Sequence, residues 1–215
     1  MSYIKEKLSL SGDFKPSIVF FAEGNPEAHF INKVLESIGG ISTDDCVIYM
    51  FGGLSKLKNK ISLVSKEPNF DNVNKVGFFV DAEDSPAARR DQIIDCLKII
   101  VFPDDLENLD NQVIVDNGKK AGVFISPGND NVGRIEDMVL EELQNKDEWE
   151  CIQQYVACIK GTLGKELDEK SITQIGVSTI DGKICGLGIA FKKGILDITH
   201  KAYEPVVNMV NNLVI

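Results

Sequence analysis

The segment Ile18–Phe30, IVFFAEGNPEAHF, decides the fold of this chain of 215 residues. Its first five residues are all apolar, which is typical of a strand that is covered on both faces of a sheet. The acid Glu23 and then Gly24 follow this run, and Asn25-Pro26 has the composition of a helix start. The pattern predicts a strand–helix unit with an acidic residue at the turn.

A second apolar run of the same kind lies at Val76–Asp84, VGFFVDAED. It ends in three acids, Asp81, Glu83 and Asp84. If this run and the strand before Glu23 are parallel neighbours in one sheet, their acids leave the sheet at the same edge. Clustered carboxylates supply the hard oxygen ligands that Mg²⁺ or Mn²⁺ prefers.

The rest of the chain continues the alternation of apolar runs with stripes at helical spacing. Further strands are expected at Cys46–Phe51 and Ala121–Ile125, and Val113–Val115 could add a short one in the acidic connection 104–118. Such alternation predicts parallel β-α-β units with right-handed crossovers, and therefore helices on both faces of the sheet.

The last third is expected to be mainly helical. Asp147–Lys160 and Ala202–Leu213 have helical spacing, while the glycine-bearing stretch Ser171–Ala190 has no defined type. The predicted organisation is an α/β core over residues 1–145 and a C-terminal extension over 146–215 that packs on the core.

Composition limits the class of partner. With 23 basic and 33 acidic residues, the chain carries a net charge of −10, so charge alone does not draw it to nucleic acid. Contact with a phosphate backbone would need a metal ion, a local basic patch or a partner protein. No apolar run approaches the length of a membrane span, and the first residues lack the apolar segment of a secretory signal. The expectation is a cytoplasmic protein without a membrane segment, whose five cysteines are free thiols.

The turn after the first strand offers Glu23, Gly24 and Glu27 as candidate ligand contacts. Gly24 permits a tight turn and close approach of the backbone to a bound phosphate. Glu27 falls in the first helical turn, where a carboxylate is also favoured by the helix dipole, so both roles stay open for it.

In the second acidic segment, Asp81 and Glu83 alternate along an extended chain and can point into one site. Ser85 is expected to cap the next helix. Arg89 and Arg90 follow directly; they could clamp a phosphate, neutralise the acids or lie in solvent.

A third segment, Ser126–Asp137, SPGNDNVGRIED, places a glycine-bearing loop at the mouth of the sheet. Glu136 could complete a second metal site, or it could stabilise the first turn of a helix. The sequence contains no P-loop, no GxGxxG at the first helix and no GxSxG elbow.

The motifs FFAEG at Phe20–Gly24 and VDAED at Val80–Asp84, in this order, resemble the Toprim signature. The resemblance extends over about Lys15–Gln144. It is nearest to small stand-alone Toprim-like proteins of bacteria and archaea that are related to OLD-family nucleases, and Pro127–Asp137 resembles a later motif of these proteins. It implies a Toprim-like (Rossmann-like), mostly parallel four-stranded sheet with helices on both faces.

The resemblance also implies roles for individual acids. Glu23 would be a metal ligand or general acid/base, Asp81 and Glu83 the paired metal-binding acids, and these three the catalytic residues. Glu27 would match an extra acid of OLD-type nucleases. At position 83 a glutamate replaces the second aspartate of the pattern, and its longer side chain moves the metal.

The resulting hypothesis is Mg²⁺- or Mn²⁺-dependent phosphoryl transfer on nucleic acid by a nuclease-like protein, in phage defence with an ATPase partner. Its metal ligands would be Glu23, Glu27, Asp81, Glu83 and Glu136, and its phosphate contacts Gly24, Arg89 and Arg90. The alternative is a non-catalytic Toprim-like module that binds a protein, a nucleotide or a metal. A receiver-like or hydrolase-like domain is a third interpretation, although no lysine is obviously placed at a strand end. None of the motifs bears on the oligomeric state.

Overall fold

The computed structural model describes residues 2–5, 10, 13–104 and 113–215. Within this part of the chain the sheet has six strands, in the order β1-β3-β2-β4-β6-β5. The strands are β1 (Ile4–Lys5), β2 (Ile18–Ala22), β3 (Cys46–Met50), β4 (Lys75–Asp81), β5 (Val113–Asp116) and β6 (Lys119–Ser126). All neighbours are parallel except β5, which pairs antiparallel with β6.

The predicted α/β class is confirmed, but the four-stranded sheet is wrong. The two additional strands lie at the two edges of the sheet. Strand β1 is only two residues long, too short to show alternation in the sequence. Strand β5 is joined to β6 by a hairpin, and its direction follows from that short turn.

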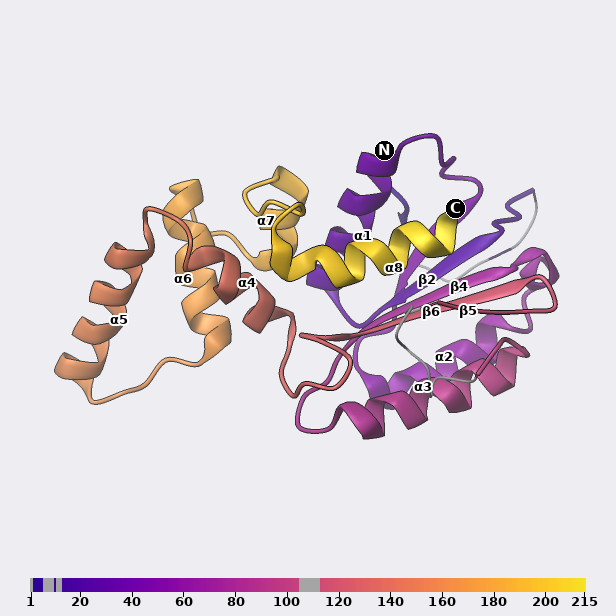
Figure 1. Ribbon diagram of the computed structural model, residues 1–215, viewed down its shortest axis with the longest axis horizontal. Helices are drawn as coiled ribbons and strands as arrows, with labels where there is room; N and C mark the ends of the chain where they lie inside the picture. The colour runs from indigo at the N-terminus through magenta and orange to yellow at the C-terminus, as the bar shows by residue number, and fades with distance from the viewer. Residues whose placement is uncertain (1, 6–9, 11–12, 105–112) are drawn as a thin grey trace.

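Helices cover both faces of the sheet, as expected (Figure 1). Helices α2 and α3 lie on one face, and α1, α7 and α8 lie on the other. Their bounds are α1 (Asn25–Ile38), α2 (Leu57–Val64), α3 (Pro86–Ile100), α7 (Leu187–Lys193) and α8 (Glu204–Val214). Single turns of 3-10 helix occur at η1 (Leu54–Lys56), η2 (Phe70–Asn72) and η4 (Lys201–Tyr203).

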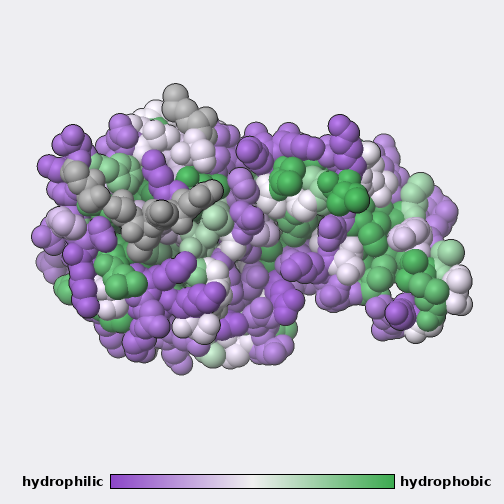
Figure 2. Space-filling model, turned by 180° about the vertical axis from the view of Figure 1, so that it is seen from behind, coloured by the Kyte–Doolittle hydropathy of each residue, from purple (hydrophilic) through white to green (hydrophobic). Residues whose placement is uncertain are grey.

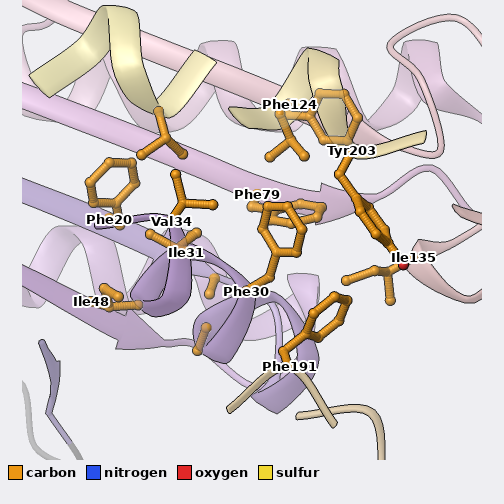
Figure 3. Packing of buried hydrophobic residues seen from close by; sticks show 14 of the residues in the cluster. Phe20, Phe30, Ile31, Val34, Ile48, Phe79, Phe124, Ile135, Phe191 and Tyr203 are labelled. Atoms are coloured by element: carbon orange, nitrogen blue, oxygen red, sulfur yellow. The ribbon is translucent and has the colours of Figure 1, made fainter. Parts of the chain in front are cut away.

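Strand β2 is buried along its whole length because its side chains alternate between two apolar layers. Phe20 packs with the α1 and α8 side, and Phe21 packs with the α2 and α3 side. In the layer on the α1 and α8 side, the ring centroid of Phe30 lies 5.1 Å from that of Phe191 and 5.3 Å from that of Tyr203 (Figure 3). These aromatic contacts join α1 to the C-terminal helices.

A pair of glycines seats helix α8 on the sheet. Gly77 of β4 and Gly122 of β6 are direct partners in the ladder. A Cβ at Gly122 would lie 2.8 Å from Met209 Sδ. One at Gly77 would clash first with the ring of Phe20 in β2 and would also lie 3.0 Å from Leu213 Cδ2. Side chains at these positions would push α8 off the sheet, so the two glycines form the recess that α8 fills.

After β6 the chain is helical. Three of these helices, α4 (Ile135–Leu143), α5 (Trp149–Leu163) and α6 (Glu169–Asp181), extend to one side, with α5 farthest from the sheet (Figure 1). The stretch of undefined type at 171–190 contains most of α6 and the start of α7. In α5 the only buried residue is Ile152, while Tyr155 and Leu163 are exposed. Seen from behind, apolar patches lie on this end of the molecule (Figure 2).

The structure describes part of the acidic connection 104–118; residues 105–112 lie outside the described residues. In the described part of the chain, every helix is too short or too polar to span a membrane.

Candidate functional site

Glu23 and Asp81 lie side by side at one edge of the sheet. Strands β2 and β4 are parallel neighbours, with Ala22 opposite Phe79. The backbone N–H of Asp81 donates to Glu23 Oε2 over 3.2 Å. The prediction that the two acidic motifs meet at the same edge is confirmed, because two adjacent parallel strands end there.

The carboxylate of Glu27 points back to the turn that follows β2. It lies in the first turn of α1, for which Gly24 is the N-cap, and its carboxylate accepts the N–H of Gly24 over 2.9 Å. A Cβ at position 24 would lie 3.3 Å from Glu27 Oε2, so glycine leaves room for the carboxylate. Glu27 is buried, with 3% of its surface exposed. Burial, and then the negative charges of Asp81 and Glu23, raise the pKa of Glu27 to about 8.

Asp81 is held by two donors, one from the last residue of β6 and one from the first residue of α4. Its Oδ1 lies 2.5 Å from Ser126 Oγ and accepts the N–H of Ile135 over 2.9 Å. Burial raises the pKa of Asp81 to about 6, against the opposing effect of these two hydrogen bonds. The charges of Glu23 and Glu136 also raise it.

We call Glu23, Glu27, Asp81 and Glu136 the carboxylate cluster. Burial raises the pKa of Glu23 as well, while the guanidinium of Arg89 lowers it. Glu136, in the first turn of α4, is buried. The cluster thus gathers four acids from the ends of β2 and β4 and from the starts of α1 and α4. Because the four carboxylates are close together and at least partly shielded from water, their negative charge favours the binding of either protons or a cation.

Glu83 belongs to the same loop as Asp81, but its carboxylate is directed to Arg134. Arg134 Nε and Nη2 donate to Glu83 Oε2 over 2.8 and 2.5 Å. The backbone of Glu83 is left-handed, with φ 51°, and it forms an isolated antiparallel bridge with Gly133. This bridge connects the acidic loop to the start of α4.

The two predicted phosphate-binding arginines lie in different surroundings. Arg89 Nε donates to the carbonyl of Asp81 over 3.2 Å, so Arg89 borders the cluster. Arg90 Nη2 instead donates to the carbonyl of Asn129 and to Asp130 Oδ1, over 3.2 and 2.7 Å. Arg90 therefore fastens α3 to the loop after β6.

A cavity of about 350 Å³ opens beside Glu83 and Arg134. It is bounded by the acidic loop, the start of α4 and the start of α6. Its ionisable lining residues are Glu83, Asp84, Arg134, Glu136, Asp137, Asp168, Glu169 and Lys170. The cavity connects the edge of the cluster to solvent and carries two basic side chains, those of Arg134 and Lys170.

Ser126 and Arg134 contact the acids of the candidate site, and the sequence did not single them out. Both lie in the segment SPGNDNVGRIED, which was marked for its glycines and its acids. Ser126 is the last residue of β6, the buried strand that pairs with β4, and this position at the strand end brings its hydroxyl to the same edge of the sheet as Asp81.

The side chains of the carboxylate cluster offer the oxygen ligands that a hard cation prefers. All four cluster side chains are carboxylates, and Mg²⁺ is commonly held through one or two carboxylates while it keeps several waters. Within the described ranges of the chain, no three His, Cys, Asp or Glu side chains are arranged to enclose a metal ion. The residues suit an open site with few protein ligands rather than a closed cage.

The fold and the site define a class of α/β protein whose acids gather at the carboxyl edge of a mainly parallel sheet. Within that class, the chain belongs to the family described as protein of unknown function (DUF3226), whose model matches residues 17–215. No curated protein matches the chain.

Two solved structures are similar to the chain. One is the C-terminal region of the Burkholderia pseudomallei OLD protein, with 16% identity and a TM-score of 0.49 over 94% of this chain and 100% of that one. The other is the C-terminal region of the Xanthomonas campestris pv. campestris OLD protein, with 15% identity and a TM-score of 0.45 over 93% of this chain and 94% of that one. Both structures are parts of OLD proteins.

Proposed function

We propose that this protein is a Toprim-like, divalent-metal-dependent phosphodiesterase that acts on nucleic acid. The carboxylate cluster carries the proposal. Burial and mutual repulsion raise the pKa values of Glu23, Glu27 and Asp81, so the ionised cluster holds negative charge that a dication would stabilise. Phosphodiesters are one class of substrate on which a carboxylate-bound Mg²⁺ or Mn²⁺ acts, and the resemblance to Toprim proteins favours them here.

Glu23 and Asp81 are the residues best placed to hold the ion, with Glu27 and Glu136 behind them. When bound, the ion supplies Lewis acidity at the phosphate and a hydroxide nucleophile at neutral pH. Ser126 and the N–H of Ile135 orient the Asp81 carboxylate.

The net charge of −10 opposes binding of nucleic acid by this chain alone. A partner protein with a basic surface would overcome this repulsion, and the ATPase that the resemblance implies is the partner we propose.

The test is a nuclease assay on single- and double-stranded DNA with Mn²⁺, Mg²⁺ or a chelator. Activity should require the metal and should fall by about 100-fold or more in Asp81→Asn, which keeps the shape of the side chain but loses its charge. Asp95→Asn is the matched control, because Asp95 lies in an exposed ion pair with Lys58. Equal activity in the wild type and Asp81→Asn would refute the proposal.

A non-catalytic binding module is the second candidate. The position of Glu83 favours it, because the acid that the resemblance pairs with Asp81 is bound to Arg134. This candidate predicts that Mn²⁺ raises the melting temperature of the wild type but not of Asp81→Asn, while no metal-dependent cleavage is detected in either protein.

A further inference from the structure

We propose that Arg134 is a binding site for a substrate phosphate, and that Glu83 occupies it in the free protein. Phosphate at Arg134 would release the Glu83 carboxylate, which could then join the carboxylate cluster. This inference rests on the proposed function and names the group that receives the phosphate.

The contact between Arg134 and Glu83 has the form of oxyanion recognition. Two N–H groups of one guanidinium, Nε and Nη2, converge on a single carboxylate oxygen, Oε2 of Glu83. The fork of an arginine binds phosphate oxygens in the same way, and a phosphate offers a further oxygen to a second donor. Glu83 therefore stands where a phosphate oxygen would be held.

The pair is open to exchange. The side chains of Arg134 and Glu83 retain 52% and 32% of their exposure, and exposed ion pairs contribute little to stability. The backbone does not need to move, because the N–H groups of Glu83 and Gly133 each donate to the other's carbonyl, over 2.8 and 2.9 Å. Only the Glu83 side chain has to change rotamer.

Arg134 and Glu83 both lie close to the carboxylate cluster, so replacing Glu83 by a phosphate at Arg134 would change the charge beside the cluster. Asp81 is two residues before Glu83, and the N–H of Ile135, the residue after Arg134, donates to Asp81. Arg134 interacts electrostatically with Glu23 and Asp81, and Glu83 with Glu23. A released Glu83 would therefore add a carboxylate beside Glu23 while the guanidinium charge is taken by the phosphate.

The cavity beside Arg134 gives the phosphate an approach from solvent. Lys170 is the second cation in its lining. Two of the acids there are already engaged: Asp137 accepts the N–H of Arg134 over 2.7 Å, and Asp168 accepts the N–H of Ser171 over 2.8 Å. Acids still outnumber bases in the cavity, so we expect the phosphate to bind together with a divalent cation. Each ligand should then tighten the binding of the other, since coupling is reciprocal.

Calorimetric titration of the full chain with Mn²⁺, alone and with a phosphate probe, tests this coupling. The probes are inorganic phosphate and a short single-stranded oligodeoxynucleotide. In the wild type we expect either probe to tighten Mn²⁺ binding by about 10-fold. An effect of inorganic phosphate without an effect of the oligonucleotide would overturn the assignment of Arg134 to a substrate phosphate.

Two variants should change metal binding in opposite directions. Arg134→Gln frees Glu83 permanently, so it should bind Mn²⁺ alone several-fold more tightly than the wild type and lose the effect of phosphate. Glu83→Gln should bind Mn²⁺ more weakly and the probes more tightly. Lys160→Gln and Glu166→Gln are the matched controls, because they break an exposed ion pair on another part of the surface.

The outcomes separate this inference from the proposed function. If Mn²⁺ binds all variants as it binds the wild type, or binds Arg134→Gln more weakly, the exchange is refuted while the metal site stands. If Mn²⁺ binds none of the proteins with or without the probes, both the exchange and the proposed function are refuted.

Discussion

The turn after β2 and the turn after β4 begin alike and differ in how their charge is compensated. Each follows a buried strand, has an acid where the strand ends and leads into a helix with a proline in its first turn. After β2, the carboxylate of Glu27 accepts one backbone N–H and is otherwise buried among acids. After β4, Asp81 accepts from Ser126 and Ile135, and Glu83 pairs with Arg134.

The difference shows that local sequence sets the position of a carboxylate, whereas distant sequence sets its charge state. The groups that hold the carboxylates of the β4 turn come from residues 126–135, at the end of β6 and after it. In the described part of the chain none of them donates a hydrogen bond to Glu23 or Glu27, and the charge of Arg134 only partly offsets that of Glu23, so most of the charge of the β2 turn is left to protons or to a cation.

Glu27→Gln should give the largest change in stability, because Glu27 is the most buried acid of the less compensated turn. Its pKa rises from 4.5 to about 8 on folding, so the folded protein binds more protons than the unfolded chain between these values. Wild-type stability should therefore fall as pH rises through this window. Urea unfolding without divalent cations should find Glu27→Gln more stable at pH 8, by on the order of 2 kcal/mol, with little difference at pH 5.

The exposed Glu166→Gln is the control for Glu27→Gln and should not show this gain at pH 8. If Glu27→Gln were destabilised equally at both pH values, the buried charge would not be what distinguishes the two turns.

Ser126→Ala tests the compensation of the β4 turn. The hydroxyl of Ser126 favours the ionised form of Asp81, so its loss should raise the pKa of Asp81 further above its usual value. We expect a loss of about 1–2 kcal/mol at pH 8, where Asp81 is charged, and a smaller loss at pH 5. Ser65→Ala removes a hydroxyl that donates to the carbonyl of Ser62, and its effect should not depend on pH. A pH-independent loss in Ser126→Ala would assign the hydroxyl to packing alone.

Glu83→Gln should have the smallest effect on stability. Its ion pair with Arg134 is partly exposed, so we expect a loss of less than about 1 kcal/mol at low salt that disappears in 1 M NaCl. Chemical unfolding at the two salt concentrations measures it. A loss above about 2 kcal/mol that persists in high salt would mean that the β4 turn depends on this pair for its structure.

The strands that carry the site could be predicted because their sequences leave little choice. Strands β2 and β4 are short apolar runs between polar turns, and Ser85 caps α3 as expected, with its Oγ accepting the N–H of Ala88 over 3.2 Å. Strand β1 could not be predicted, because two residues carry no periodicity. The antiparallel direction of β5 depends on the turn at Asn117-Gly118, where both residues have positive φ, as in the tight turns that join antiparallel strands.

In the site, the meeting of Glu23 and Asp81 could be predicted from strand order, but the direction of Glu83 could not. Alternation along an extended chain placed Glu83 beside Asp81, whereas its backbone is left-handed and its carboxylate pairs with Arg134. That conformation is fixed by the bridge to Gly133, fifty residues further along the chain. The pairing of Arg90 with the loop at Asn129 is a long-range contact of the same kind.

The seating of α8 on the glycine pair has a consequence for biosynthesis. All six strands precede α8 in the chain, and the recess at Gly77 and Gly122 is filled by Met209 and Leu213. While the ribosome is still translating the segment before residue 204, the recess on this face of the sheet is not covered by α8. We therefore expect a nascent chain that has emerged only to the end of α6 to be sensitive to proteases and bound by chaperones, and to acquire its compact state only after α8 has left the exit tunnel.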